Sequence, residues 1–144
     1  MTEDRADGHT LVPGRASGAA VVLEEPLSFW GGFDPVTGAV VDPSHPQAGA
    51  VLTDRVLIMP SGRGSSSSSS VVAEAIRRGT GPRAILLRHP DPILAVGAMV
   101  AAELYGRSCP VVVLGAGEYG ALGEGEVEVE VEAGPDRAVI RTRR

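Results

Sequence analysis

Lysine is absent from this 144-residue sequence, and all 13 of its basic residues are arginine. The absence excludes lysine chemistry, including Schiff bases and the lysine of a phosphate-binding P-loop. The arginine-only composition is typical of a GC-rich bacterial coding bias. A formal net charge of −5 argues against nucleic acid as a partner, because binding to nucleic acid needs a clustered basic surface.

Cysteine is nearly absent too. The single Cys109 excludes an internal disulfide framework and cannot by itself ligate zinc or an iron–sulfur cluster. We therefore expect this chain to bind no cofactor, and any metal to come with another chain. Cys109 stands just before Pro110 and an apolar run, which predicts a small buried hydrophobic residue.

Long apolar runs are missing as well. The longest, residues 93–102, is interrupted by Gly97 and is too short to span a bilayer. Residues 1–9 are polar and acidic and lack the apolar core of a signal peptide. We expect a cytoplasmic protein with no membrane contact. Residues 1–10 are predicted to be a flexible tail, and residues 11–144 a single domain.

Short apolar strands alternate with two helical patterns in the centre of the chain. The predicted strands are 18–23, 38–42, 56–59, 84–87, 110–114, 126–132 and 138–140, and the predicted helices are 66–78 and 91–104. Gly79 and Gly106 are the expected helix ends. The central order β-α-β-α-β predicts an α/β fold, layered, with a second, smaller sheet formed by the β-rich flanks.

Six consecutive serines, beginning at Ser65, follow the sequence Ser61-Gly62-Arg63-Gly64 and lead into the helix predicted over residues 66–78. Composition alone is typical of a flexible linker, but a connection of a few residues between a buried strand and its helix belongs to a compact domain. The missing lysine excludes a P-loop, and the absence of G-x-S-x-G excludes a nucleophile elbow.

Ser65 is the candidate catalytic residue. A serine acts as a base only where fixed dipoles stabilise its alkoxide, and a helix N-terminus supplies such dipoles. Arg63 adds a charge that binds a carboxylate or phosphate, and Gly64, Ser66 and Ser67 are the other candidate substrate-binding residues. The alternative for Ser66 and Ser67 is helix capping.

Three further patterns have competing interpretations. The aromatic cluster Phe29, Trp30 and Phe33 either plugs the edge of the core or lines a ligand or subunit surface. His45 is predicted to be a solvated loop residue. The run GAGEYG at residues 115–120 fits G-x-G-x-x-G, but we reject a nucleotide site because a Gly/Glu-rich turn is expected there instead of a helix.

His89 and Asp91 could join Ser65 in a serine hydrolase arrangement. Isolated histidine and aspartate residues are common in loops, and no oxyanion motif accompanies these. Capping of the second helix by Asp91 is the simpler interpretation.

Four segments taken together resemble the small, swivel-domain subunit of the aconitase X family. They are PGRASGAA at 13–20, SFWGGFDPVTG at 28–38, His45-Pro46, and PSGRGSSS at 60–67. The resemblance runs from about residue 11 to the C-terminus. It implies a swivelling β/β/α domain like the mobile fourth domain of aconitase.

The resemblance also implies a function. Members of the family are hydro-lyases whose large subunit carries the iron–sulfur cluster, and Ser65 matches their general base. In aconitase the motif continues Gly-Ser-Ser-Arg, and that arginine binds a substrate carboxylate. Ser67 stands at this position here, so Arg63 is the candidate to replace it.

We therefore expect half of a two-subunit dehydratase, active only with its cluster-bearing large subunit. The expected small-molecule substrate is cis-3-hydroxy-L-proline, and the alternative is 5-phosphomevalonate. A hypothesis of another class is a non-catalytic module that binds an anion or serves as a swivelling interaction domain.

Overall fold

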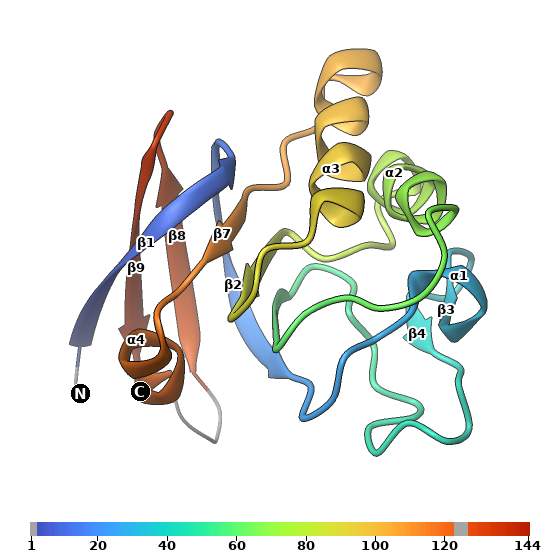
Figure 1. Cartoon of the computed structure of the whole chain (residues 1–144), viewed down its shortest axis with the longest axis horizontal. Helices are drawn as coiled ribbons and strands as arrows, with labels where there is room; N and C mark the ends of the chain where they lie inside the picture. The colour runs from blue at the N-terminus through green and yellow to red at the C-terminus, as the bar shows by residue number, and fades with distance from the viewer. Residues whose placement is uncertain (1–2, 123–126) are drawn as a thin grey trace.

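The computed structural model of the chain describes residues 3–122 and 127–144 (Figure 1). Within these residues, seven strands close into a barrel in the order β1-β7-β6-β5-β2-β8-β9. The strands are β1 (Glu3–Val12), β2 (Gly14–Val22), β5 (Val56–Met59), β6 (Ala84–Leu87), β7 (Val111–Val113), β8 (Glu128–Ala133) and β9 (Arg137–Arg143). Glu126, the start of one predicted strand, lies outside the described residues.

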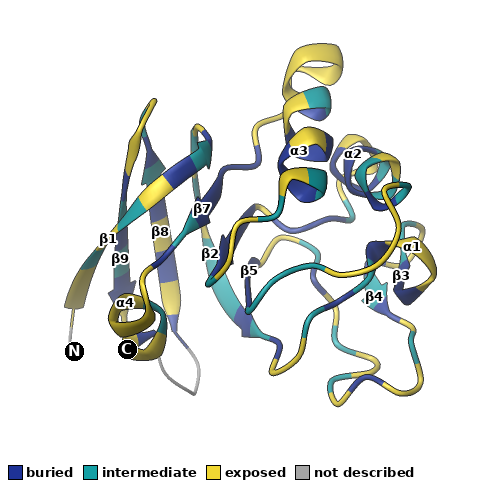
Figure 2. Cartoon of the chain, in the orientation of Figure 1, coloured by how far each residue is buried: buried dark blue, intermediate teal, exposed yellow. Residues whose placement is uncertain are grey.

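Strands β2, β5, β6 and β7 run parallel, and they separate two apolar cores (Figure 2). Leu57 and Met59 of β5 pack in the core between the strands and the helices, whereas Val56 and Ile58 pack inside the barrel. Strands covered on both faces read as continuous apolar runs, which is why β5 and β6 were predictable.

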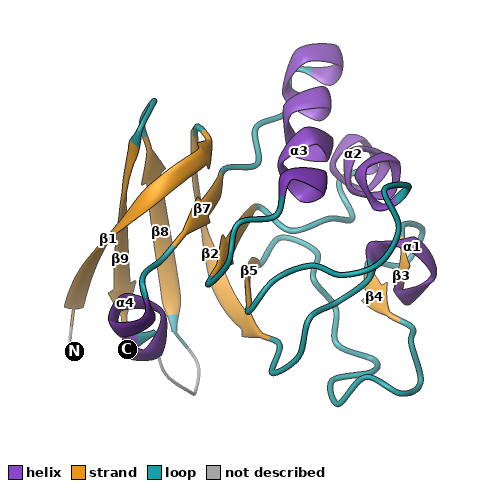
Figure 3. Cartoon of the chain, viewed as in Figure 1, coloured by secondary structure: helices purple, strands orange, loops and turns teal. Residues whose placement is uncertain are grey.

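Two helices, α2 (Ser68–Arg78) and α3 (Pro92–Tyr105), cover the parallel strands on the side away from β8 and β9 (Figure 3). Gly79 and Gly106 end them with φ of 78° and 64°. The helices touch at Gly97, where a Cβ atom would lie 2.6 Å from the carbonyl oxygen of Ser69. No helix of the described ranges is long and apolar enough to cross a membrane.

The remaining elements are short. Residues 23–55 connect β2 to β5. This connection contains the single turn α1 (Phe29–Gly32) and the paired strands β3 (Phe33–Asp34) and β4 (Ala39–Val40). The six-residue helix α4 (Ala116–Ala121) follows β7.

Two predictions about the flanks are wrong. Residues 3–10 of the expected flexible tail belong to strand β1, which pairs with β9 from Glu3–Arg143 to His9–Arg137. The expected separate sheet does not form from β8 and β9, because β8 pairs with β2 and β9 pairs with β1. All three strands complete the same barrel, since closure leaves no strand edge unpaired.

The parallel strands bring three loops to one edge of the sheet. Residues 23–28 follow β2, residues 60–67 follow β5, and residues 88–91 follow β6. The N–H groups of Arg88 and His89 donate to the carbonyl oxygen of Pro60 at 3.1 and 3.0 Å, which joins two of these loops. These three loops therefore lie together at the carboxyl ends of the parallel strands.

Candidate functional site

Ser65 opens the tight turn that leads into α2. Its side-chain Oγ accepts the N–H of Ser67 at 3.0 Å, and its carbonyl oxygen accepts the N–H of Ser68 at 3.0 Å. Ser67, the residue before the helix, has helical backbone angles and makes no side-chain cap bond. The capping role therefore falls to Ser65, the candidate base itself.

The hydroxyl of Ser65 is accessible, and two fixed dipoles lie beside it. The residue is exposed, so a substrate can reach it. The Ser67 N–H points at Oγ, and the eleven residues of α2 place the positive end of a helix dipole beside it. Fixed dipoles of this kind favour an alkoxide over the neutral hydroxyl.

The serine turn is held by the segment that contains the aromatic cluster. Leu27 forms a parallel bridge with Gly62, and its carbonyl oxygen accepts the N–H of Arg63 at 3.2 Å. Further along, the N–H of Trp30 donates to Oγ of Ser68 at 3.1 Å. Residues 27–30 and 62–68 therefore lie side by side, although more than thirty positions separate them in the sequence.

Two glycines make this close approach possible. Gly64 has φ of +94°, and a Cβ atom on it would lie 2.6 Å from Oγ of Ser28. A Cβ atom on Gly62 would lie 2.5 Å from Oδ2 of Asp91. An alanine at position 64 would therefore be strained by its φ and crowd Ser28, and one at position 62 would crowd the side chains of Asp91 and Leu94.

Arg63 lies on the open side of the turn. Its Nη2 is 3.9 Å from Oδ2 of Asp42, and its side chain is about half exposed. Hydrogen bonds from Ser44 to the Asp42 carboxylate lower the pKa of Asp42, and the charge of Arg63 lowers it further. This long ion pair leaves guanidinium donors available for an anionic ligand.

The hydroxyls of Ser66 and Ser67 make no hydrogen bond with another residue of the described ranges. Their carbonyl oxygens accept the hydroxyls of Ser69 and Ser70, at 2.9 and 2.8 Å. The Ser66 and Ser67 hydroxyls therefore remain free to contact a ligand. Ser68 differs from both, because it is buried and its Oγ is occupied by Trp30.

The structure does not assemble a serine hydrolase triad. Oδ1 of Asp91 accepts the N–H groups of Ile93 and Leu94 at 2.9 and 3.2 Å, which is the predicted cap of α3. His89 is exposed. Within the described ranges, no hydrogen bond joins Ser65, His89 and Asp91.

His45 is a structural residue, and its predicted solvation is wrong. It is 3% exposed. Its Nδ1 accepts the N–H of Gln47 at 3.0 Å, which leaves the proton on Nε2 to donate to the carbonyl oxygen of Glu25 at 3.1 Å. The imidazole thereby connects the loop that contains His45 and Gln47 to Glu25, which lies in the segment after β2.

Cys109 is buried, as predicted, with 1% exposure. Its Sγ donates to the carbonyl oxygen of Pro82 at 3.5 Å, and burial raises its pKa to about 12. The described residues contain no group of three or more His, Cys, Asp or Glu side chains able to hold a metal ion.

The G-x-G-x-x-G run was expected to lie in a turn without a helix, and this prediction is wrong, because helix α4 follows β7. Glycine-rich segments have low helix propensity, so this helix was not predicted. The side chain of Glu118 folds back over Gly115 at the helix start. A carboxylate in that place repels the phosphates that the motif would bind.

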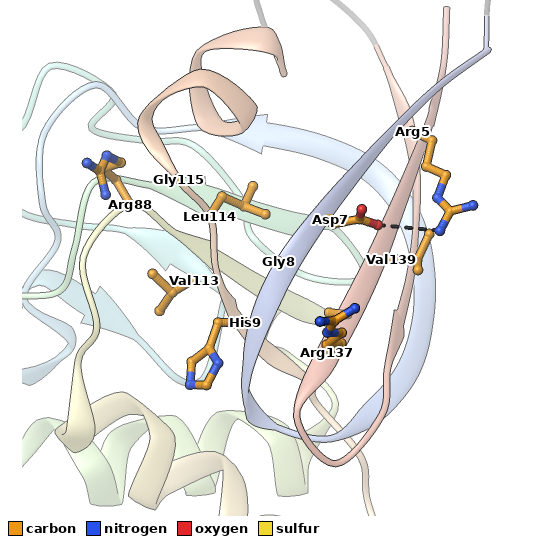
Figure 4. A pocket seen from close by; sticks show the side chains of 11 residues that line it. Arg5, Asp7, Gly8, His9, Arg88, Val113, Leu114, Gly115, Arg137 and Val139 are labelled. Carbon is orange, nitrogen blue, oxygen red and sulfur yellow. Dashed lines mark hydrogen bonds and ion pairs between the residues drawn. The ribbon is translucent and has the colours of Figure 1, made fainter.

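A cavity of about 560 Å³ lies elsewhere, on the outside of the barrel (Figure 4). Its polar lining comes from β1, β9 and the loop after β6, and includes Arg5, His9, Arg88 and Arg137. None of the predicted site residues lines it. The Ser65 turn therefore lies outside this cavity.

Comparisons with known proteins identify the fold and the family. A family model for the aconitase X swivel domain matches residues 5–141. A crystal structure of Thermococcus kodakaraensis aconitase X matches with a TM-score of 0.80 and 29% identity, over 95% of this chain and 98% of that chain. The predicted mixed α/β swivel fold is thereby confirmed.

Two curated relatives differ in length. The chain is 47% identical over 133 residues to a cis-3-hydroxy-L-proline dehydratase of Pseudomonas aeruginosa, which is 88% of this chain and 23% of that protein. It is 37% identical over 135 residues to the phosphomevalonate dehydratase small subunit of Methanothermobacter thermautotrophicus, which is 94% of this chain and 97% of that one. The chain thus spans less than a quarter of the first relative, and it belongs to the aconitase X swivel-domain family.

Proposed function

We propose that this chain supplies the general base, Ser65, to a dehydratase site that a large aconitase X chain completes. The observation that carries the proposal is the exposed Ser65 hydroxyl, which accepts the Ser67 N–H at the start of α2. Relatives of this chain are named dehydratases, and relatives of similar length are named small subunits.

In this proposal the step performed by this chain is a proton transfer. Ser65 as alkoxide removes the proton from the carbon next to the substrate's carboxylate or equivalent group. The C–H electron pair forms the new C=C bond, and the hydroxyl leaves from the neighbouring carbon with its bonding pair. Proton and hydroxide together are one water, so the step needs no oxidant or reductant.

Arg63 binds the anionic group of the substrate in this proposal, with hydroxyls of Ser66 and Ser67 and the N–H of Gly64 beside it. The half-exposed guanidinium and the two unoccupied hydroxyls support these roles. Ser67 cannot supply the charge of the arginine that aconitase has at this position. Arg63 is the nearest cation in the sequence.

The described residues do not fit an iron–sulfur cluster. The only cysteine is buried, holds its proton on the thiol, and belongs to no group of three or more potential metal ligands among the described residues. We therefore assign the cluster to the large chain, and no step on this chain depends on it.

We propose cis-3-hydroxy-L-proline as the substrate. The 47% identity to the Pseudomonas aeruginosa dehydratase over 88% of this chain supports this choice. Phosphomevalonate dehydratase small subunits are 37% identical over 94% of this chain and 51% identical over a shorter stretch, 56% of it, so 5-phosphomevalonate is the alternative. Turnover of each compound by the reconstituted complex decides between them. A complex that dehydrates only 5-phosphomevalonate would contradict the choice.

The base assignment is tested by Ser65→Ala in the complex with the large chain. General-base catalysis is worth about 10²- to 10⁴-fold, so we expect kcat to fall by that factor while the complex still assembles. Ser70→Ala is the matched control, because Ser70 is an exposed serine of the same run whose hydroxyl donates to a helix carbonyl. It should retain turnover within a few-fold.

A second variant separates catalysis from capping. Ser65→Asn keeps an oxygen that can accept the Ser67 N–H, so the turn should keep its stability while turnover is lost. Full turnover in Ser65→Ala would leave the anion-binding or interaction module as the better description. Labelling of the isolated chain by a fluorophosphonate probe at Ser65 would instead favour a hydrolase.

A further inference from the structure

Trp30 is the chain's single tryptophan, and it is 57% exposed. Its neighbours Phe29 and Phe33 are buried, with ring centroids 5.0 Å apart. The aromatic cluster therefore divides into two parts. The phenylalanines plug the core edge, while the indole, the largest side chain of the group, stands in solvent.

The backbone of Trp30 is held from both sides. Its N–H donates to Oγ of buried Ser68 at 3.1 Å, and its carbonyl oxygen accepts the hydroxyl of Ser28 at 2.9 Å. Gly31 then turns the chain with φ of +85°, and the N–H of Gly32 donates back to the carbonyl oxygen of Ser28 at 3.0 Å. The indole is thus presented from a fixed turn. An aromatic side chain has only two rotatable angles, so its ordering on binding from such a turn costs little conformational entropy.

The same two serines place Trp30 at the rim of the catalytic turn. Ser28 lies against Gly64, the residue before Ser65, and Ser68 lies three residues after Ser65. A second exposed apolar residue, Val41, is attached to this rim, because its N–H donates to the carbonyl oxygen of Gly32 at 2.9 Å.

We propose that Trp30 is the anchor by which this chain docks onto the large, cluster-bearing chain, with its indole in an apolar pocket of that chain. The inference rests on the proposed function. An alkoxide base needs a dry site, yet Ser65 is exposed, so the chain that completes the site must cover the surface around it. A partner covering Ser65 also covers Trp30, and buried tryptophans at the centre of an interface carry much of its binding energy.

The binding test uses the full chain and the aconitase X large chain of the same organism. Trp30→Ala should raise the dissociation constant by about 30-fold or more, which is the effect of losing a binding hot spot. Leu104→Ala is the matched control, because Leu104 is 68% exposed but lies near the far end of α3 from Asp91. It should leave the dissociation constant within about threefold, as interface-remote residues do.

A second measurement does not depend on a variant. The chain grown with 5-fluorotryptophan carries one fluorine label, at Trp30, and its ¹⁹F resonance loses the solvent isotope shift when the large chain buries it. We expect that loss on titration with the unlabelled large chain. An unchanged resonance in the assembled complex would overturn the inference.

The outcomes separate this inference from the proposed function. If wild-type complex forms and Trp30→Ala binds equally well, Trp30 is not the anchor, whatever the activity. If Trp30→Ala binds equally well but raises KM, the indole contacts substrate, and docking is overturned. If Trp30→Ala abolishes assembly while the wild-type complex dehydrates none of the hydroxy acids offered, docking stands and the proposed function fails.

Discussion

Substitution of Gly64 by alanine tests whether the serine turn and the aromatic segment are packed as described. Two costs add at this position. Gly64 has φ of +94°, a conformation that costs a residue with a Cβ atom about 1–2 kcal/mol. The new Cβ atom would also lie 2.6 Å from Oγ of Ser28, so this hydroxyl must rotate away.

The rotation has its own cost. Oγ of Ser28 donates to the carbonyl oxygen of Trp30 at 2.9 Å, and loss of this hydrogen bond removes about 1 kcal/mol. The expected loss in the free energy of unfolding is therefore about 2–3 kcal/mol. Gly49→Ala is the matched control, because Gly49 has φ of +95° and no atom within 4 Å of the added Cβ. It should cost only the conformational part, about 1–2 kcal/mol.

Guanidinium denaturation of both variants measures the difference, and a Ser28→Ala background tests its cause. Without the Ser28 hydroxyl, the cost of Gly64→Ala should fall toward that of Gly49→Ala. Equal costs for the two glycine variants in the wild-type background would refute the packing of Ser28 on Gly64. So would a cost of Gly64→Ala that is the same with and without the hydroxyl.

Two further predictions concern stability. Asp91→Ala removes the acceptor for the Ile93 and Leu94 N–H groups and should cost about 1–2 kcal/mol in denaturation, whereas Asp91→Asn, which can still cap, should cost less. Cys109 should react with a disulfide reagent at about pH 8 only as the chain unfolds, because its thiolate is suppressed. Since burial raises its pKa from 9.0 to about 12, the folded chain keeps a proton that the unfolded chain releases. This contribution to stability is complete below pH 9 and is lost as pH rises toward 12. An unfolding temperature that does not change over this pH range would contradict the prediction.

The elements with local signals were predictable from the sequence. Helix α3 has Asp91 before it, Pro92 in its first turn and Gly106 after it, and each of these signals acts within a few residues. The continuous apolar runs of β5 and β6 reflect burial on both faces.

Strand β1 carried no such signal. Its positions that face the barrel interior, Ala6, Gly8 and Thr10, are all small or polar, and Val12, after a shift in register, packs in the other core. Without an alternation of large apolar and polar residues, the segment reads as a polar tail. It becomes a strand because β9, more than a hundred residues later, pairs with it and closes the barrel.

The serine run shows why the site was only partly predictable. The sequence places Ser65 at the start of a helix, but it cannot distinguish the buried Ser68 from the more accessible serines on either side of it. That difference depends on where the first turn begins and on contact with Trp30, a residue from another loop. If the predicted start of α2 is wrong by one or two residues, every serine in the run is assigned to a different position of the first turn.

The solvent exposure of Ser65 also explains why we expect this chain to be inactive without the large chain. Coulomb interactions between nearby charges are about fourfold weaker in water than at the dielectric near a protein surface, so the Ser67 N–H and the α2 dipole stabilise an alkoxide poorly while Ser65 is solvated. The stabilisation becomes effective only when another surface excludes water. Hydroxyls of Ser28 and Ser68 bond the backbone of Trp30 to the turn that carries the candidate base. In our proposal, this one part of the chain therefore both binds the covering surface and positions the proton acceptor beneath it.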